Sequence, residues 1–153
     1  MSLSTSRLAM LALSCALFGS VGAFAADTEE TPASANNSGF DSAKALVDAQ
    51  KYDEALPALR QLDQQGPNNP DVLNLIGFSL RKTGKMDEAL DYYNRALALN
   101  PQHRGANEYL GELYLETKQP DKAKDRLEVL RQACGDCEEF EDLQQQINRY
   151  AAQ

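Results

Sequence analysis

The sequence has few of the residues from which catalytic sites and nucleic-acid surfaces are commonly built. It contains no Trp and a single His, His103, which excludes multi-histidine metal sites. Lys and Arg number 15 against 23 Asp and Glu. A formal net charge of −8 argues against a nucleic-acid partner, because phosphate contacts need an excess of basic side chains. With only three Cys, six Pro and nine Gly in 153 residues, the chain is not disulfide-dense, collagen-like or of low complexity.

The beginning of the chain has the pattern of a secretory signal peptide. Arg7 is the only charged residue among the first 25, and the apolar and small residues 8–24 end in Ala23-Phe24-Ala25, a typical cleavage site. The apolar run is too short and too interrupted for a membrane anchor. We therefore expect residues 1–25 to be removed on export, to the periplasm in a Gram-negative bacterium, which leaves no transmembrane segment. Cys15 could instead be a lipoprotein cysteine, but removal with the signal peptide is favoured.

Residues 26–39 are expected to form a flexible linker. They contain no large apolar side chain and are rich in Ser, Thr, Asn, Asp and Glu. Such a segment cannot bury enough surface to offset the entropy lost on ordering. Asn36 also begins an N-glycosylation motif, which is relevant only in a eukaryotic source.

The rest of the chain is periodic, with a period of about 34 residues. Similar residues recur at this interval, which we call the repeat step, in seven columns that begin at Ala43, Leu46, Asp53, Ala55, Leu59, Leu62 and Pro67. Each window divides into two amphipathic helical patterns around a break, such as the one at residues 82–85. We expect the two helices to cross closely at Gly77 and Ala89. The recurring Asp53, Asp87 and Asp121 are expected to cap the second helices.

This pattern resembles the tetratricopeptide repeat (TPR) family, whose antiparallel helix pairs stack into a right-handed superhelix. Residues 70–103 match best, with Leu73, Ile76, Gly77, Leu80, Ala89, Tyr93, Ala96 and Pro101. The resemblance implies an all-α TPR solenoid over residues 40–153, with repeats at about 36–69, 70–103 and 104–137. The first helix is expected to start late, because Gly39 and Ser42 stand at apolar positions.

Residues 138–153 are expected to form a capping helix. Phe140, Leu143, Ile147 and Tyr150 recur at helical spacing and form one apolar face, while the other face is polar. The acidic residues 138–142 fit the first turn of this helix, where the dipole favours negative charge; binding of a cation or a basic partner is the less favoured interpretation.

TPR proteins usually bind their partners along the surface that the first helix of each repeat lines. We assign the same positions to each repeat of this chain by counting along the repeat step, and we add Lys82. These residues are predicted to form a partner-binding groove. The groove residues are Phe40, Lys44, Val47, Asn74, Phe78, Arg81, Lys82, Glu108, Tyr109 and Glu112. Phe78 and Tyr109 are either peptide anchors or simply packed against the neighbouring helix. The basic clamp that grips a carboxylate in chaperone-docking TPR domains is absent, since four of its five places are taken by Phe40, Leu75, Gly105 and Tyr109.

Cys134 and Cys137 form the one local motif with chemical potential. They lie in the expected turn between the third repeat and the cap, and a disulfide that staples this turn is the favoured interpretation. Redox exchange and metal capture remain alternatives.

The leading hypothesis is therefore a non-catalytic, exported TPR adaptor without a cofactor or metal. It would bind a protein or peptide in the groove and pair Lys44, Arg81 and Lys82 with an acidic or C-terminal segment. One alternative is a thiol–disulfide or metal-handling accessory protein that uses Cys134 and Cys137. Another is a structural subunit of an envelope complex.

Overall fold

The computed structural model describes residues 32–66 and 68–153, with side chains from Ser38 onward. The expected signal peptide, Cys15 and the start of the expected linker lie outside the described residues. The described chain forms seven α-helices and no strand. They are α1 (Pro32–Asp48), α2 (Tyr52–Gln65), α3 (Pro70–Lys82), α4 (Met86–Leu99), α5 (Arg104–Glu116), α6 (Pro120–Ala133) and α7 (Glu138–Ala151). None of these helices has the length and apolar character needed to cross a bilayer.

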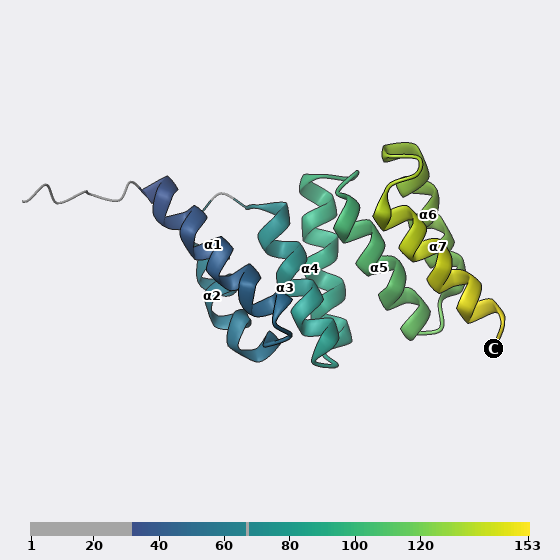
Figure 1. Ribbon diagram of the computed structural model, residues 1–153, viewed down its shortest axis with the longest axis horizontal. Helices are drawn as coiled ribbons and strands as arrows, with labels where there is room; N and C mark the ends of the chain where they lie inside the picture. The colour runs from purple at the N-terminus through teal and green to yellow at the C-terminus, as the bar shows by residue number, and fades with distance from the viewer. Residues whose placement is uncertain (1–31, 67) are drawn as a thin grey trace, which may run out of the picture.

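The helices form a row of antiparallel pairs, with α7 packed at the end of the row (Figure 1). The second helices α2, α4 and α6 each have 14 residues and begin at Tyr52, Met86 and Pro120, one repeat step apart. The first helices α3 and α5 each have 13 residues and are offset by the same step. The predicted all-α solenoid is confirmed. Because α7 begins one repeat step after α5, it occupies the place of a fourth first helix.

The start of the domain differs from the prediction. Helix α1 begins at Pro32, so residues 32–39 are helical and the prediction of a linker there is wrong, as is the late start of the first helix. The sequence has local reasons for this start. Proline is well tolerated in the first turn of a helix, and Ala33 and Ala35 have high helix propensity.

The predicted caps of the second helices are also wrong. The N-cap positions of α2, α4 and α6 are Lys51, Lys85 and Gln119, none of which makes a side-chain capping hydrogen bond. The recurring aspartates instead lie at the second helical position. There their charge still favours the positive end of the helix dipole, but their side chains do not cap the helix.

The single histidine has a structural role at the start of α5. His103 is the N-cap residue, and its Nδ1 accepts a hydrogen bond of 3.0 Å from the Ala106 backbone N–H. Its Nε2 lies 3.0 Å from Asp71 Oδ1. Because Asp71 belongs to the first turn of α3, His103 joins the starts of two successive first helices.

The core lies between the helices of each pair and between successive pairs. Gly77 is confirmed as a close-approach position, since a Cβ atom there would lie 2.8 Å from the Tyr93 ring. Its close partner is Tyr93 rather than Ala89, although Ala89 is also fully buried. At the equivalent Gly111, a Cβ atom would instead meet Leu143 of α7 at 2.5 Å. Helix α7 therefore supplies contacts that the third pair does not make by itself.

Candidate partner-binding groove

The first helices and α7 present one continuous surface, which we call the groove face. It consists of the predicted groove residues other than Val47, together with the positions that continue the repeat step onto α7, Asp142 and Gln146. Two adjoining hollows lie beside α5 and α7. The smaller, of about 150 Å³, is lined by residues of α3, α5 and α7, and the larger, of about 660 Å³, by α5, α7 and residues that follow these two helices. Their shared lining residues are Leu115, Glu116 and Gln146.

A row of three aromatic side chains crosses this part of the molecule. The ring centroid of Phe78 lies 4.6 Å from that of Tyr109 and 5.9 Å from that of Tyr52. All three side chains are half-buried. Packing against the neighbouring helix is therefore confirmed for Phe78 and Tyr109, and because part of each ring stays exposed, their use as anchors stays a prediction. Tyr52 was not predicted, because it begins a second helix and falls outside the groove phase.

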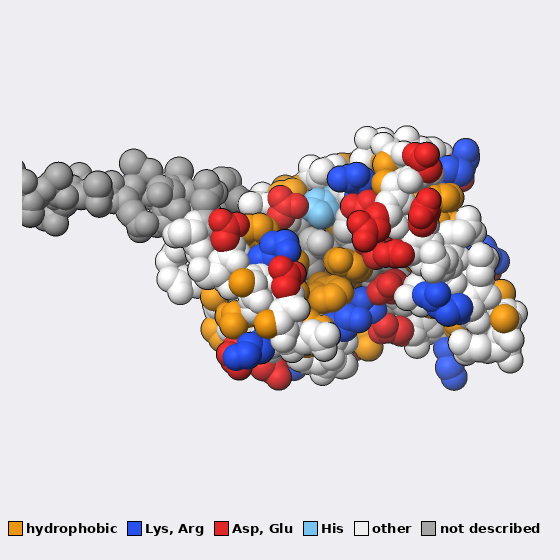
Figure 2. Space-filling model, in the orientation of Figure 1, with side chains coloured by type: hydrophobic (Ala, Val, Ile, Leu, Met, Phe, Trp, Pro, Cys, Tyr) orange, Lys and Arg blue, Asp and Glu red, His pale blue; other side chains and the backbone are white. Residues whose placement is uncertain are grey.

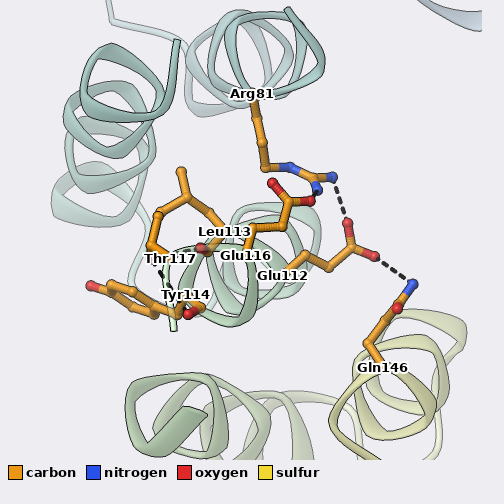
Figure 3. A network of polar contacts seen from close by, with 7 residues as sticks. All are labelled: Arg81, Glu112, Leu113, Tyr114, Glu116, Thr117 and Gln146. Atoms are coloured by element: carbon orange, nitrogen blue, oxygen red, sulfur yellow. Dashed lines mark hydrogen bonds and ion pairs between the residues drawn. The ribbon is translucent and has the colours of Figure 1, made fainter. Parts of the chain in front are cut away.

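Arg81 is buried and already paired, so the prediction that it pairs with an acidic partner is wrong. Its side chain is only 2% exposed, and its two terminal nitrogens lie 2.5 Å from Glu112 and 2.5 Å from Glu116 (Figure 3). The Gln146 amide donates a hydrogen bond of 3.3 Å to Glu112 from α7. This network connects α3, α5 and α7, so Arg81 positions the groove face instead of contacting a ligand.

The surroundings of Arg81 keep it charged. Burial lowers the pKa of Arg81, but Tyr93, Glu112 and Glu116 raise it, and the net shift is upward. Arg81 also lies over two aromatic rings, with its Cζ 5.5 Å from the Phe78 centroid and 5.9 Å from the Tyr109 centroid. A charged guanidinium that is held by carboxylates and covers aromatic rings fixes those rings in place.

Glu108 is buried without a counter-ion. The residue is 7% exposed, and no hydrogen bond or ion pair reaches its carboxylate from the described part of the chain. Burial raises the pKa of Glu108 to about 8, and the nearby carboxylates of Glu112, Asp142 and Glu139 contribute, while Arg81 lowers it. Glu108 is therefore largely protonated at neutral pH. Burial likewise raises the pKa of Tyr109 to about 12, with Glu108 as the next cause.

The remaining predicted groove residues differ in accessibility. Lys82 is exposed, and its Nζ lies 5.2 Å from the Phe78 ring centroid. Lys44 is exposed on α1 and pairs with Asp48 at 2.7 Å. Phe40 is half-buried against the core, and Asn74 is buried with no hydrogen-bond partner for its Oδ1 among the described residues. Val47 belongs to the core, so it does not contribute to a binding surface.

Besides Tyr52, two residues at this site were not predicted, Glu116 and Gln146. Two more, Glu139 and Asp142, were considered only within the acidic residues 138–142, for which binding of a basic partner was the less favoured interpretation. Two of these four residues carry a signal that sequence reasoning could have used. One repeat step from Glu108 leads to Asp142, and the same step from Glu112 leads to Gln146. The signal was missed because residues 138–153 were treated as a cap rather than as a further first helix.

The two cysteines form a disulfide between Cys134 and Cys137, with a Cα–Cα distance of 5.6 Å. Cys134 is the C-cap of α6 and Cys137 the N-cap of α7, so the bond closes the turn that joins these helices. This agrees with the predicted staple. In the described part of the chain, no three His, Cys, Asp or Glu side chains are grouped so as to hold a metal ion.

Comparisons with known proteins agree with this architecture. Two tetratricopeptide repeat family models match the chain, one at residues 40–104 and one at residues 80–147. The chain is a TPR protein. No curated protein sequence matches it at a significant level. Members of the TPR family are generally non-catalytic adaptors.

Several solved TPR structures share the fold at low sequence identity. The TPR domain of Sgt2 from Aspergillus fumigatus has a TM-score of 0.69 and 18% identity, over 80% of this chain and 81% of that domain. The first TPR domain of Spaghetti, bound to an HSP90 peptide, has a TM-score of 0.69 and 18% identity. The match covers 82% of this chain and 99% of that domain. The Yersinia enterocolitica chaperone SycD, in complex with a peptide of the translocator YopD, has a TM-score of 0.65 and 15% identity. The match covers 76% of this chain and 88% of SycD.

Proposed function

We propose that this TPR protein is a non-catalytic, exported adaptor that binds a protein or peptide along its groove face. The observation that carries the proposal is the half-buried pair Phe78 and Tyr109, held in place by the Arg81 network, which also lines the smaller hollow. Aromatic side chains in such positions are frequent anchors of peptide binding. Two proteins of the same fold, the TPR domain of Spaghetti and SycD, have structures in complex with peptides, which supports the same use here.

Site-specific photocrosslinking in the source cell tests the proposal. A photoreactive amino acid placed at the exposed Lys82 is expected to give a discrete adduct with one partner. The matched control is Lys122, which is also exposed but lies on the second helix α6. Adducts at Lys122 and none at Lys82 would contradict groove binding and favour the alternative of a structural subunit that uses its outer face.

The proposed export rests on residues 1–25 and has its own test. N-terminal sequencing of the protein recovered from its source is expected to begin at Ala26, the residue after the Ala23-Phe24-Ala25 motif. A chain that retains residues 1–25 would contradict the proposal. Recovery from the periplasmic fraction is the corresponding expectation in a Gram-negative source.

The disulfide supports a second candidate, a thiol–disulfide accessory function. A reduction potential below about −300 mV is expected if the bond between Cys134 and Cys137 is only a structural staple. A potential of about −120 to −270 mV, within the range of dedicated oxidoreductases, would favour redox exchange instead.

A further inference from the structure

The charged residues of the groove face are distributed unevenly, with the acidic ones on α5 and α7 and the basic ones on α1 and α3. Arg81 is occupied by Glu112 and Glu116. Glu139 of α7 lies 3.5 Å from Arg104, a contact made at the edge of this face. Two carboxylates of the groove rows, those of Glu108 and Asp142, have no ion-pair partner in the described part of the chain.

Figure 2 shows this distribution on the surface. Acidic side chains gather over α5 and the first half of α7, and hydrophobic side chains lie near the centre of the face, between α1 and α5. The acidic group and the aromatic rings are neighbours along the chain as well, since Glu108 and Tyr109 are adjacent and Glu112 follows one helical turn later. An occupant of the groove would therefore meet apolar and negative surface together.

We propose that the groove face binds an extended partner segment that carries a basic side chain beside an apolar one. The basic side chain lies against Glu108 and Asp142, and the apolar side chain covers Phe78 and Tyr109. This inference rests on the proposed adaptor function and names the chemistry of its partner. It replaces the expectation of an acidic or C-terminal segment.

Charge complementarity decides between the two kinds of segment. An acidic segment would find Arg81 buried and already paired, and Lys44 paired with Asp48, which leaves Lys82 as its one free cation among the predicted basic groove residues. It would also be repelled by Asp142, and by Glu108 at pH values where that carboxyl group is ionised. A basic segment is attracted to those carboxylates. Its cation would also offset the free-energy cost of ionising the buried Glu108.

This mode of binding has a proton signature. In the free protein, Glu108 faces Glu112 of its own helix, Asp142 and Glu139 of α7, and Arg81 of α3, and its pKa is about 8. A bound cation favours the ionised carboxylate and so lowers that pKa. Binding near pH 7 therefore releases a proton, and affinity rises as the pH is raised from 6.5 to 8.5. General electrostatic attraction to an acidic surface would not produce this release.

The probe is a phage-displayed library of random dodecapeptides, selected on the full protein and then resynthesised. We expect the enriched peptides to combine Lys or Arg with a large apolar residue. Isothermal titration calorimetry of one such peptide, in two buffers of different ionisation enthalpy at pH 7, measures the proton release. Salt should weaken the binding, because both unpaired carboxylates contribute.

Two charge-removing variants and one control sharpen the test. Glu108→Gln and Asp142→Asn are each expected to weaken the peptide by about tenfold at pH 8.5, and Glu108→Gln should also abolish the proton release. The control, Glu141→Gln, removes the same charge from an exposed position next to Asp142 but outside the groove rows, and should leave affinity within about twofold. Circular dichroism checks that each variant is folded.

The possible outcomes separate this inference from the proposed function. Enrichment of acidic peptides whose binding is lost in Phe78→Ser would overturn the basic-segment inference while supporting the groove. Basic peptides that bind without proton release, and equally well to Glu108→Gln, would also overturn it. Peptides of any charge that are insensitive to Phe78→Ser, or no enrichment at all, would contradict both the inference and the groove.

Discussion

The middle helix pair, α3 with α4, and the third pair, α5 with α6, have the same backbone arrangement. Their buried side chains differ. In the middle pair, Leu73 is a fully buried apolar residue. The equivalent residue in the third pair is Asn107, whose amide donates hydrogen bonds of 3.0 Å to the Pro101 and His103 carbonyls. Its oxygen accepts a bond of 3.3 Å from Arg126 of α6. A buried polar residue is tolerated there because its hydrogen bonds are made.

The close-approach glycines show the same difference. Gly77 receives the Tyr93 ring from within its own pair, whereas Gly111 receives Leu143 from α7. The middle pair is therefore closed by its own side chains, and the third pair is completed from outside. This comparison teaches that α7 is a part of the third repeat's packing and of the groove, in addition to covering the end of the array.

The largest expected effect comes from the contact that α7 makes with the third pair. Leu143 is fully buried, so Leu143→Ala should lower the free energy of unfolding by about 3 kcal/mol through lost burial and a cavity. Leu99→Ala, at a position 47% exposed, is the control and should cost under about 0.5 kcal/mol. Chemical denaturation measures both.

A double-mutant cycle sharpens this prediction. Gly111→Ala alone should destabilise the protein, because its Cβ atom collides with Leu143. In the Leu143→Ala background the same change should stabilise it, since space is free and Ala has a higher helix propensity than Gly. Additive effects would contradict the packing of Gly111 against α7.

The disulfide should contribute the next largest effect, and only to the third pair. Closing a loop of four residues contributes about 2 kcal/mol in the chain-entropy account, so the Cys134→Ser, Cys137→Ser variant should lose about that much. Amide hydrogen exchange should show faster opening in α6 and α7, with α3 and α4 unchanged. Equal loss of protection in all four helices would mean that the two pairs are not held independently.

A pH-dependent difference between the pairs is expected at one equivalent position. Asn74 of the middle pair corresponds to Glu108, whose pKa is raised from 4.5 to about 8 in the folded protein. The folded state then holds a proton that the unfolded state releases, so stability should fall as the pH rises from about 4.5 to about 8. We expect a loss on the order of 1.5 kcal/mol, because neighbouring groups relax and water reaches part of the carboxyl group.

Glu108→Gln should remove this pH dependence, whereas Glu141→Gln should keep it. Thermal unfolding at pH 5 and pH 9 provides the measurement. A Glu108→Gln variant whose stability still falls between these two values would show that another group is responsible.

The smallest effect concerns the turns between the helices of a pair. Gln50, Gly84 and Lys118 are equivalent residues with φ angles of 60°, 82° and 60°. Left-handed backbone is strained for residues other than glycine. Lys118→Gly should therefore raise stability by about 0.5 kcal/mol, and Gly84→Ala should lower it by about 1 kcal/mol. Stability changes of the opposite sign would contradict equivalent turns.

Much of the architecture could be predicted from the sequence, because period and apolar spacing are properties of the chain itself. Residues that recur at the repeat step, such as Ala55 and Ala89, predicted how the helices pair. The same repeat phase predicted that Cys134 and Cys137 lie in a turn. The start of α1 was missed because the segment before Phe40 lacks large apolar residues, and only Ala33 and Ala35 in it strongly favour a helix. The aspartate caps failed because a shift of two residues along a helix changes a cap into a first-turn side chain.

The groove residues were predicted less well than the helices that carry them. The phase brought Phe78, Tyr109 and Glu112 to one face, but it could not show that Arg81 is buried and paired, since that depends on carboxylates from another helix. The pKa of Glu108 is raised first by burial and by Glu112 of its own helix, and then by Asp142 and Glu139 of α7. The site is held together by interactions between successive first helices. These interactions cannot be read from the composition of the chain.

The most direct test of the central claim is amide hydrogen exchange of the protein with and without a bound partner segment, taken from the crosslinked partner or the enriched peptide. We expect the added protection to be confined to the first helices α3 and α5 and to α7, around Phe78, Glu108 and Asp142. Protection confined to the second helices α2, α4 and α6 would contradict it.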